Sequence, residues 1–259
     1  MAVQSPPRPD AGDASATGLY CYGIVSARNA RPQRRGLGDA PVEPVAHDGV
    51  AALASSVPAG TVRARRRDLL SHMDVLGAAF EHGTVLPLRF GTVFENEGSL
   101  VQDFLAPRHD ELAALLRDLS GHGELRVTAH YREDAILAEV VRENRRIAQL
   151  REATRGAGAG HPALIELGEL VAAEVQARTA RDSRALLERL RKQARRYEVG
   201  DEPIEYELLR ASFLVDQKRV ANFEAELERF AADQAGRADV KLTGPLPPHS
   251  FVSLRHGGH

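Results

Sequence analysis

One apolar segment, TVLPLRFGTVF at residues 84–94, combines side chains of types that rarely occur together in a strand. The segment is apolar and β-branched enough to form a buried strand, yet it holds Pro87 and Arg89 in its middle. Proline removes a hydrogen-bond donor from a sheet, and a guanidinium is costly to bury without a partner. The segment therefore predicts an edge strand or bulge in which Arg89 leaves the strand face to bond carbonyls or a carboxylate at the domain junction. The alternative, which can hold together with the first, is a partner-binding surface made by Arg89, Phe90 and Phe94.

The sequence offers little support for catalysis or metal binding. It contains no phosphate-binding glycine loop, no paired zinc-ligand motif and no nucleophile elbow. His72 and His82 fall on one side of an expected helix, but about 15 Å apart, which disfavours a shared metal ion. Carboxylate pairs such as Asp201 and Glu202 are expected in turns. We therefore expect a protein that is not an enzyme, with no catalytic residues, no metal site and no cofactor.

Composition is that of an ordinary globular protein with room for two modest domains. The chain has 259 residues, of which 43% are hydrophobic and 27% charged, and its net charge is -2. That charge gives no general attraction to nucleic acids or anionic membranes, and no apolar run approaches the roughly 18 residues of a spanning helix. The single cysteine, Cys21, fits a reducing cytoplasm and favours a buried small hydrophobe over a reactive thiol.

The strands and helices expected around the 84–94 segment form a mixed α+β pattern. Residues 1–17 are expected to be a disordered leader, and residues 18–27 read as a first strand. Two runs before residue 58 could be strands or helices. Residues 68–82 have helical spacing, with Asp68 as the expected N-cap and Gly83 as the stop. A further helical stretch is broken at Pro107. Residues 18–121 are therefore predicted to form an N-terminal α+β domain, a variant of the ferredoxin-like fold.

The second half of the chain predicts a ferredoxin-like domain that carries a helical arm. Residues 124–131 alternate between polar and apolar side chains, as in a half-buried strand. Two long helical stretches over about 134–196, joined by GAGAGH, predict a coiled-coil-like helical hairpin, with Asn144 as a polar interruption. The polar stretch QARTARDSR, residues 176–184, is expected to stand clear of the core or to move.

The remaining residues complete that second domain. A strand at 211–215, an amphipathic helix at 217–234, and a last strand, proline-rich turn and short strand follow the arm. The order from residue 122 to 255 is strand, two helices, strand, helix, strand, which is typical of a ferredoxin-like fold.

Charge is unevenly distributed, and this leaves a second class of function open. Seven arginines fall within residues 31–67, whereas the last quarter of the chain is acidic. The alternative hypothesis is therefore a ferredoxin-like regulator that binds nucleic acid through its arginine-rich loops. Its binding would weaken steeply with added salt, which distinguishes it from apolar capture of a protein partner.

Four motifs in order resemble one known family. LYCYGIV near the start, HGTVLPLRFGTVF, ASFLVDQ, and the closing GPLPPHSFV look like the gas vesicle protein family GvpF/GvpL over residues 18–254. The family ending usually carries an aromatic pair, where this chain has Leu246 and His249.

The resemblance implies a non-enzymatic accessory protein of gas vesicle assembly, with a chaperone-like or nucleating role. It implies the hydrophobic shell protein and other gas vesicle accessory proteins as partners, with no nucleic acid and no membrane. It also implies a location in the cytoplasm and at the gas vesicle. We expect the partner-binding residues to be Arg89, Phe90, Gly91, Phe94, Pro247 and Phe251. The sequence leaves open the F or L subtype, the docking site and its stoichiometry, retention in the mature vesicle, and the oligomeric state.

Overall fold

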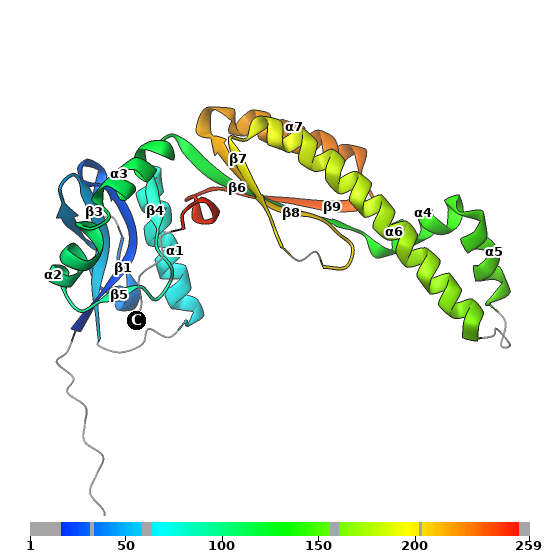
Figure 1. Ribbon diagram of the computed structural model, residues 1–259, viewed down its shortest axis with the longest axis horizontal. Helices are drawn as coiled ribbons and strands as arrows, with labels where there is room; N and C mark the ends of the chain where they lie inside the picture. Colours follow the sequence, from blue (N-terminus) through cyan, green and yellow to red (C-terminus); the bar gives the residue numbers. More distant parts are fainter. Residues whose placement is uncertain (1–16, 32–33, 59–63, 156–160, 202–203, 254–259) are drawn as a thin grey trace, which may run out of the picture. The chain divides into compact units, whose positions relative to one another are not determined.

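A computed structural model describes residues 17–31, 34–58, 64–155, 161–201 and 204–253 of the chain (Figure 1). Residues 1–16 of the expected leader, and residues 156–160 of the expected link between the arm helices, lie outside the described residues.

The chain divides into two compact units. Unit 1 consists of residues 1–121 together with 247–259, and unit 2 of residues 122–246. Each unit contains one antiparallel sheet and several helices, so the chain is a mixed α+β protein, as predicted. The predicted domain ranges differ from the units at the C-terminus, because residues 247–253 group with unit 1.

Unit 1 is built on a sheet of the order β2-β3-β1-β4, with β5 also paired to β1. All of these pairings are antiparallel. The runs that could have been strands or helices are therefore both strands. The strands are β1 (Thr17–Ser26), β2 (Glu43–His47), β3 (Val50–Pro58), β4 (Val85–Pro87) and β5 (Val93–Phe94).

Helix α1 (Arg66–Glu81) packs on this sheet through a close approach to β1. A Cβ atom at Gly23 would lie 2.8 Å from the Leu76 side chain and 2.8 Å from the Leu86 carbonyl oxygen, so only glycine fits there. The predicted N-cap is wrong: the helix begins at Arg66 with Arg65 as its N-cap. Asp68 lies in the first turn, where its negative charge complements the helix dipole instead.

Short helical segments complete unit 1. Pro107 separates the predicted helical stretch into two parts, as expected. These are α2 (Glu97–Ser99) continued by a π-helical turn (Leu100–Leu105), and α3 (His109–Asp118). After Pro247 and Pro248 the chain forms a 3-10 turn (His249–Phe251), so the predicted final short strand is wrong.

Unit 2 is built on a sheet of the order β7-β8-β6-β9, again wholly antiparallel. The predicted alternation in its first strand is confirmed, because Leu125, Val127, Ala129 and Tyr131 are all buried. The strands are β6 (His122–Tyr131), β7 (Arg196–Val199), β8 (Glu207–Asp216) and β9 (Ala238–Leu246).

The helices of unit 2 are α4 (Glu133–Glu143), α5 (Arg145–Ala153), α6 (His161–Leu190) and α7 (Val220–Asp233). Helix α6 packs on β8 and α7 on β9, and the N-terminal part of α6 lies beside α4 and α5 (Figure 1). The first predicted arm helix is not continuous. Asn144 is extended, with φ -102° and ψ 106°, and its side chain accepts hydrogen bonds from the backbone of Arg146 and Ile147 to start a new helix.

Candidate functional site

The predicted 84–94 strand is interrupted, and its two halves pair with the same strand. Residues 85–87 (β4) and 93–94 (β5) both pair with β1 at one edge of the sheet. Between them, the Leu88 backbone donates to the Tyr22 carbonyl at 2.9 Å, and the Thr92 carbonyl accepts from Cys21 at 2.9 Å. The segment is therefore an edge strand with a bulge, which is the setting that tolerates a proline.

The bulge is a tight turn that projects Arg89 outward. The Thr92 backbone and hydroxyl both donate to the Arg89 carbonyl, at 3.2 and 2.8 Å. Gly91 has a φ of 90°, a conformation that favours glycine at the third position of such a turn. Arg89 is exposed, and no salt bridge joins its guanidinium to a carboxylate of the described residues. The turn thus presents a cation at the sheet edge.

Behind the turn lies a cluster of aromatic rings. Phe90 contacts the rings of Tyr20 and His72 edge-on, with centroids 5.8 and 5.7 Å apart. The Tyr20 hydroxyl lies 2.8 Å from His72 Nδ1 and accepts a hydrogen bond from the Gly91 backbone at 3.3 Å. Phe90 itself is half-buried. The cluster therefore fixes the turn from beneath while leaving part of one ring accessible.

Burial holds the titratable groups of this cluster neutral. His72 is 3% exposed, and burial, followed by the nearby His249, lowers its pKa to about 4. Burial also raises the pKa of Tyr20, and it raises the pKa of the Cys21 thiol to about 12. An uncharged imidazole and an uncharged phenol suit a structural hydrogen bond, and neither is poised for proton transfer near neutral pH.

The predicted partner-binding residues divide by accessibility. Arg89 and Gly91 are exposed and Phe90 is half-buried, so these three can be touched by a partner. Phe94 is buried in ring contact with Phe104, and Pro247 and Phe251 are also buried. Those three residues can only support a surface from below.

Exposed apolar side chains on α1 are a feature that the sequence reading missed. Leu69, Leu70 and Met73 are 40%, 54% and 38% exposed, on the helix that also carries His72. The helical spacing of this segment predicts an apolar stripe, but one stripe does not reveal how much of it the sheet covers. Unit 1 therefore presents an accessible apolar helix face and a bulged, basic sheet edge.

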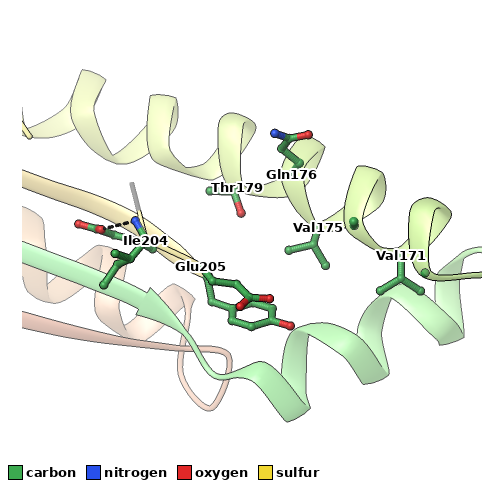
Figure 2. Close-up of a pocket in the computed structure, with 10 residues that line it drawn as sticks. Val171, Val175, Gln176, Thr179, Ile204 and Glu205 are labelled. Carbon is green, nitrogen blue, oxygen red and sulfur yellow. Dashed lines mark hydrogen bonds between the residues drawn. The ribbon is translucent and has the colours of Figure 1, made fainter. Parts of the chain in front are cut away.

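Unit 2 contains a separate groove between α6 and the segment that leads into β8 (Figure 2). Its volume is about 610 Å³. Val175 points from α6 toward the segment that holds Glu205, whereas the Gln176 side chain points away from it; Val171 and Thr179 also line the groove. This groove could not be predicted from local sequence patterns, because its two walls come from separate segments of the chain, α6 and residues 204–207.

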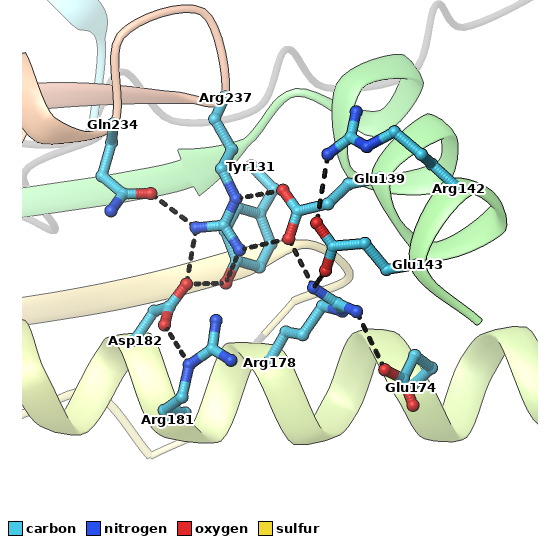
Figure 3. Close-up of polar contacts among 10 residues, drawn as sticks. All are labelled: Tyr131, Glu139, Arg142, Glu143, Glu174, Arg178, Arg181, Asp182, Gln234 and Arg237. Carbon is cyan, nitrogen blue, oxygen red and sulfur yellow. Dashed lines mark hydrogen bonds and ion pairs between the residues drawn. The ribbon is translucent and has the colours of Figure 1, made fainter.

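A buried polar cluster lies on another side of α6 (Figure 3). Arg237 contacts Glu139 and Asp182, each at 2.5 Å, and its guanidinium lies over the Tyr131 ring, 4.8 Å from the centroid. Arg178 contacts Glu139 at 2.5 Å and Glu143 at 2.9 Å. The cluster thus joins α4, α6, the end of β6 and the start of β9 through charged groups.

The expectation that residues 176–184 stand clear of the core is wrong, and this cluster is the reason. Arg178 and Asp182 are each only 8% exposed. Burial alone would raise the pKa of Asp182, but hydrogen bonds from Arg181, Tyr131 and Arg237 outweigh it and lower the pKa to about 2. Every charge of this helical stretch that is buried has an opposite charge beside it, as buried charges require.

Within the described part of the chain, no three metal-ligating side chains gather into a group that could hold an ion. Among the helices of that same part, none combines the length and the apolar character that crossing a membrane demands.

Comparison with known proteins shows the relationship of the chain directly. The family model described as "Gas vesicle synthesis protein GvpL/GvpF" matches residues 18–253. Gas vesicle protein F of Streptomyces sp. (strain CB03234) is 36% identical over 239 residues, covering 90% of this chain and 98% of that protein. Gas vesicle protein L of Haloferax mediterranei is 26% identical over 197 residues, covering 71% of this chain and 61% of that protein.

Two solved structures are similar over almost their whole length. The crystal structure of GvpF from Anabaena sp. PCC7120 aligns with a TM-score of 0.80 at 26% identity, covering 93% of this chain and 100% of that one. GvpF from Microcystis aeruginosa aligns with a TM-score of 0.73 at 25% identity, covering 92% and 99%. The resemblance carried by the four motifs is therefore confirmed, and the chain belongs to the gas vesicle synthesis protein GvpL/GvpF family.

Proposed function

We propose that the chain is an accessory protein of gas vesicle assembly that binds the hydrophobic shell protein before it is incorporated. The observation that carries the proposal is the family match over residues 18–253, which supports a role in gas vesicle assembly. The relatives carry names of gas vesicle proteins and not of enzymes, which is in keeping with a binding role.

The physical need for such a protein follows from the shell subunit. A subunit that presents an apolar face to gas aggregates in water unless that face, or its strand edges, is covered. Strand addition to an accessible sheet edge satisfies backbone groups, and an apolar surface covers side chains, without any catalytic residue. Unit 1 offers both kinds of contact.

We place the capture surface on unit 1. It comprises the turn with Arg89, Phe90 and Gly91, and the exposed α1 residues Leu69, Leu70 and Met73. Phe94, Pro247 and Phe251 contribute from beneath, by holding the sheet edge and the C-terminal turn in place. Phe90 and α1 are linked through the Phe90–His72 ring contact, so displacing the turn would also disturb the helix.

The proposal also includes the fold of unit 2, further partners and the location of the protein. The strand order β7-β8-β6-β9 in unit 2, with helices after β6 and after β8, supports a ferredoxin-like arrangement there. Helices α4 to α6 would form its helical arm. Other accessory proteins of the vesicle are proposed as additional partners, and the cytoplasm and the gas vesicle as the sites of action.

Capture in two salt concentrations tests the proposal. The purified full-length protein is mixed with the shell protein coexpressed from the same gene cluster, and the shell protein that stays in solution is measured at low and high salt. Apolar capture should persist at high salt, because salt screens charges and not apolar contacts. Shell protein that aggregates as it does alone would refute direct capture. Capture that collapses with salt would show that charges, and not apolar contacts, hold the shell protein.

Matched variants locate the surface. Leu70→Ser and Arg89→Ala should each reduce capture while leaving the melting temperature within a few degrees of the wild type, because both side chains are exposed. Arg28→Ala, another exposed arginine of unit 1, is the control and should change neither property. If Arg89→Ala lowers the melting temperature, and capture decreases only as much as the loss of folded protein explains, Arg89 has a structural role alone.

A further inference from the structure

The groove of unit 2 has one wall formed by an apolar stripe of α6. Gly168, Val171, Ala172 and Val175 line it and recur at helical spacing, so they share one face of the helix. Leu164, 47% exposed, lies one turn before Gly168 and extends this stripe toward the N-terminus of α6. From Leu164 to Thr179 the stripe is roughly 22 Å long at the rise of an α-helix.

Small residues in that stripe leave room for a close neighbour. A Cβ atom built at Gly168 meets nothing within 4 Å, and the next residue one turn along is Ala172. Helices approach to about 8–10 Å when the side chains between them are small. The shape of this wall therefore suits a second helix lying along α6 better than a compact small molecule.

The opposite wall has an unusual backbone conformation and hydrogen bonds to its neighbours. Ile204 is 60% exposed and stands at the edge of the groove. Tyr206 has a φ of 61°, which is strained for a bulky side chain. Its carbonyl accepts from the Tyr131 backbone at 2.8 Å, and the Ile204 backbone donates to the Glu207 carboxylate at 3.0 Å. An exposed isoleucine on this wall is a suitable anchor for a partner.

The charged side chains that line the groove are all acidic. Its ten lining residues include Glu205 and Glu207 and no lysine or arginine. Glu207 is paired with Arg210 at 2.9 Å, so the accessible charge comes from Glu205. Partial burial, and then the negative charges of Glu133 and Glu205, raise the pKa of Tyr206.

The two arginines of α6 nearest the groove, Arg178 and Arg181, are each paired with carboxylates of other residues. Arg178 is paired with Glu139, Glu143 and Glu174, and Arg181 is paired with Asp182. The groove is therefore an apolar surface with an acidic rim.

We propose that this groove binds an amphipathic helix of a partner protein, one that presents a stripe of apolar side chains flanked by lysine or arginine. The apolar stripe would pack along α6 and against Ile204, and the basic side chains would meet Glu205. A second copy of the chain is a poorer occupant, because a symmetric pairing of two such grooves would bring their acidic rims together.

This site is separate from the capture surface proposed above, since it lies wholly within unit 2. A chain with both sites would hold two different partners at once. Failure of either site would leave the other unaffected, so the two proposals can be tested apart.

The test uses a synthetic helical peptide and the full-length protein. A labelled peptide of about 18 residues, roughly 27 Å long as a helix, carries leucine at every third or fourth position and lysine beside that stripe. A matched peptide carries glutamate in place of lysine. Fluorescence anisotropy should show saturable binding of the lysine peptide, and binding of the glutamate peptide at least about tenfold weaker.

Three variants of the protein, each checked by its thermal melt, complete the design. Ile204→Ser should weaken binding of the lysine peptide about tenfold, as loss of a central apolar anchor does. Glu205→Gln should weaken it about threefold and reduce its dependence on salt. Val199→Ser, at an exposed apolar residue of β7 that does not line the groove, is the control and should bind the peptide as the wild type does.

The outcomes are decisive in both directions. Absence of saturable binding, equal binding of the two peptides, or unchanged binding by Ile204→Ser would each overturn the proposal. A wild type that is a dimer by light scattering, with Ile204→Ser a monomer, would identify a second copy as the occupant and would overturn it as well. Loss of peptide binding in Ile204→Ser with normal shell-protein capture would support two independent sites.

Discussion

Lowering the pH should destabilise unit 1 through a single buried histidine. His72 has a pKa of about 4 in the folded protein, against about 6.5 for an ordinary histidine. Between these values the unfolded chain binds a proton at this residue and the folded chain does not. Stability is therefore fully present above pH of about 6.5 and is lost progressively as the pH falls toward 4.

The size of the effect follows from the pKa difference. A difference of about 2.5 pKa units corresponds to about 3 kcal/mol, and about 2 kcal/mol of this is lost between about pH 7 and pH 4.5. His72 is 3% exposed and its ring is enclosed by Tyr20, Tyr22 and Phe90, so solvent screening does little to reduce the figure.

Urea denaturation at the two pH values measures this contribution when the wild type is compared with His72→Phe. The phenylalanine keeps a ring in the aromatic cluster but has no proton to gain, so the variant should lose about 2 kcal/mol less than the wild type on acidification. It should also start lower at neutral pH, because the Tyr20 hydroxyl loses its partner on the imidazole.

His82→Gln is the control, since His82 is exposed at the end of the same helix. Its pH dependence should match that of the wild type. Equal pH dependence in the wild type and His72→Phe would refute the reasoning, whatever the stability of the variant at neutral pH.

Three further outcomes are expected. Arg237→Met should lower the free energy of unfolding by about 3 kcal/mol in chemical denaturation, because it leaves buried carboxylates short of a partner, whereas Arg146→Met removes an exposed pair with Glu166 and should cost less than about 0.5 kcal/mol. Gly36→Ala should lower the melting temperature markedly, since its Cβ would lie 1.8 Å from the Tyr22 hydroxyl, whereas Gly77→Ala in α1 meets nothing within 4 Å and should raise it slightly; a rise for both would contradict the packing described. Cys21 should resist alkylation at mildly alkaline pH until denaturant is added, as followed by mass spectrometry, and rapid labelling of the native protein would contradict its burial.

The spacing of apolar residues predicted strands and helices correctly where a single period was clear. The alternation of residues 124–131 and the apolar spacing of the α7 segment both correspond to elements whose apolar side is buried. Pro107 and Gly83 marked real helix ends, because both effects are local to the backbone.

Long-range pairing explains what the sequence did not reveal. Residues 176–184 hold almost no apolar side chains, which indicated an exposed stretch. In the structure Arg178 and Asp182 are nevertheless buried, where Arg178 pairs with Glu139 of α4 and Asp182 pairs with Arg237. Nothing local to α6 identifies those partners. Asn144 was noticed as a polar interruption, but its role as the cap of a separate helix depends on its backbone angles.

The candidate sites were predictable to different degrees. Pro87 and Arg89 pointed to a bulged edge because proline and buried arginine are each incompatible with a central strand. The accessibility of Phe90, and the burial of Phe94 and Phe251, depend on which rings and turns cover them. The groove of unit 2 could not be predicted from the sequence, because only the fold of the sheet brings α6 and residues 204–207 side by side.

The division of the chain into units has a consequence for biosynthesis. Unit 2 is an insertion in unit 1, which ends with residues from 247 onward. These residues include Phe251, which is buried, and His249, which helps to lower the pKa of His72. During translation the whole of unit 2 emerges from the ribosome before this last piece of unit 1. Unit 2 can thus fold before the residues from 247 onward join unit 1, although unit 1 begins earlier in the sequence.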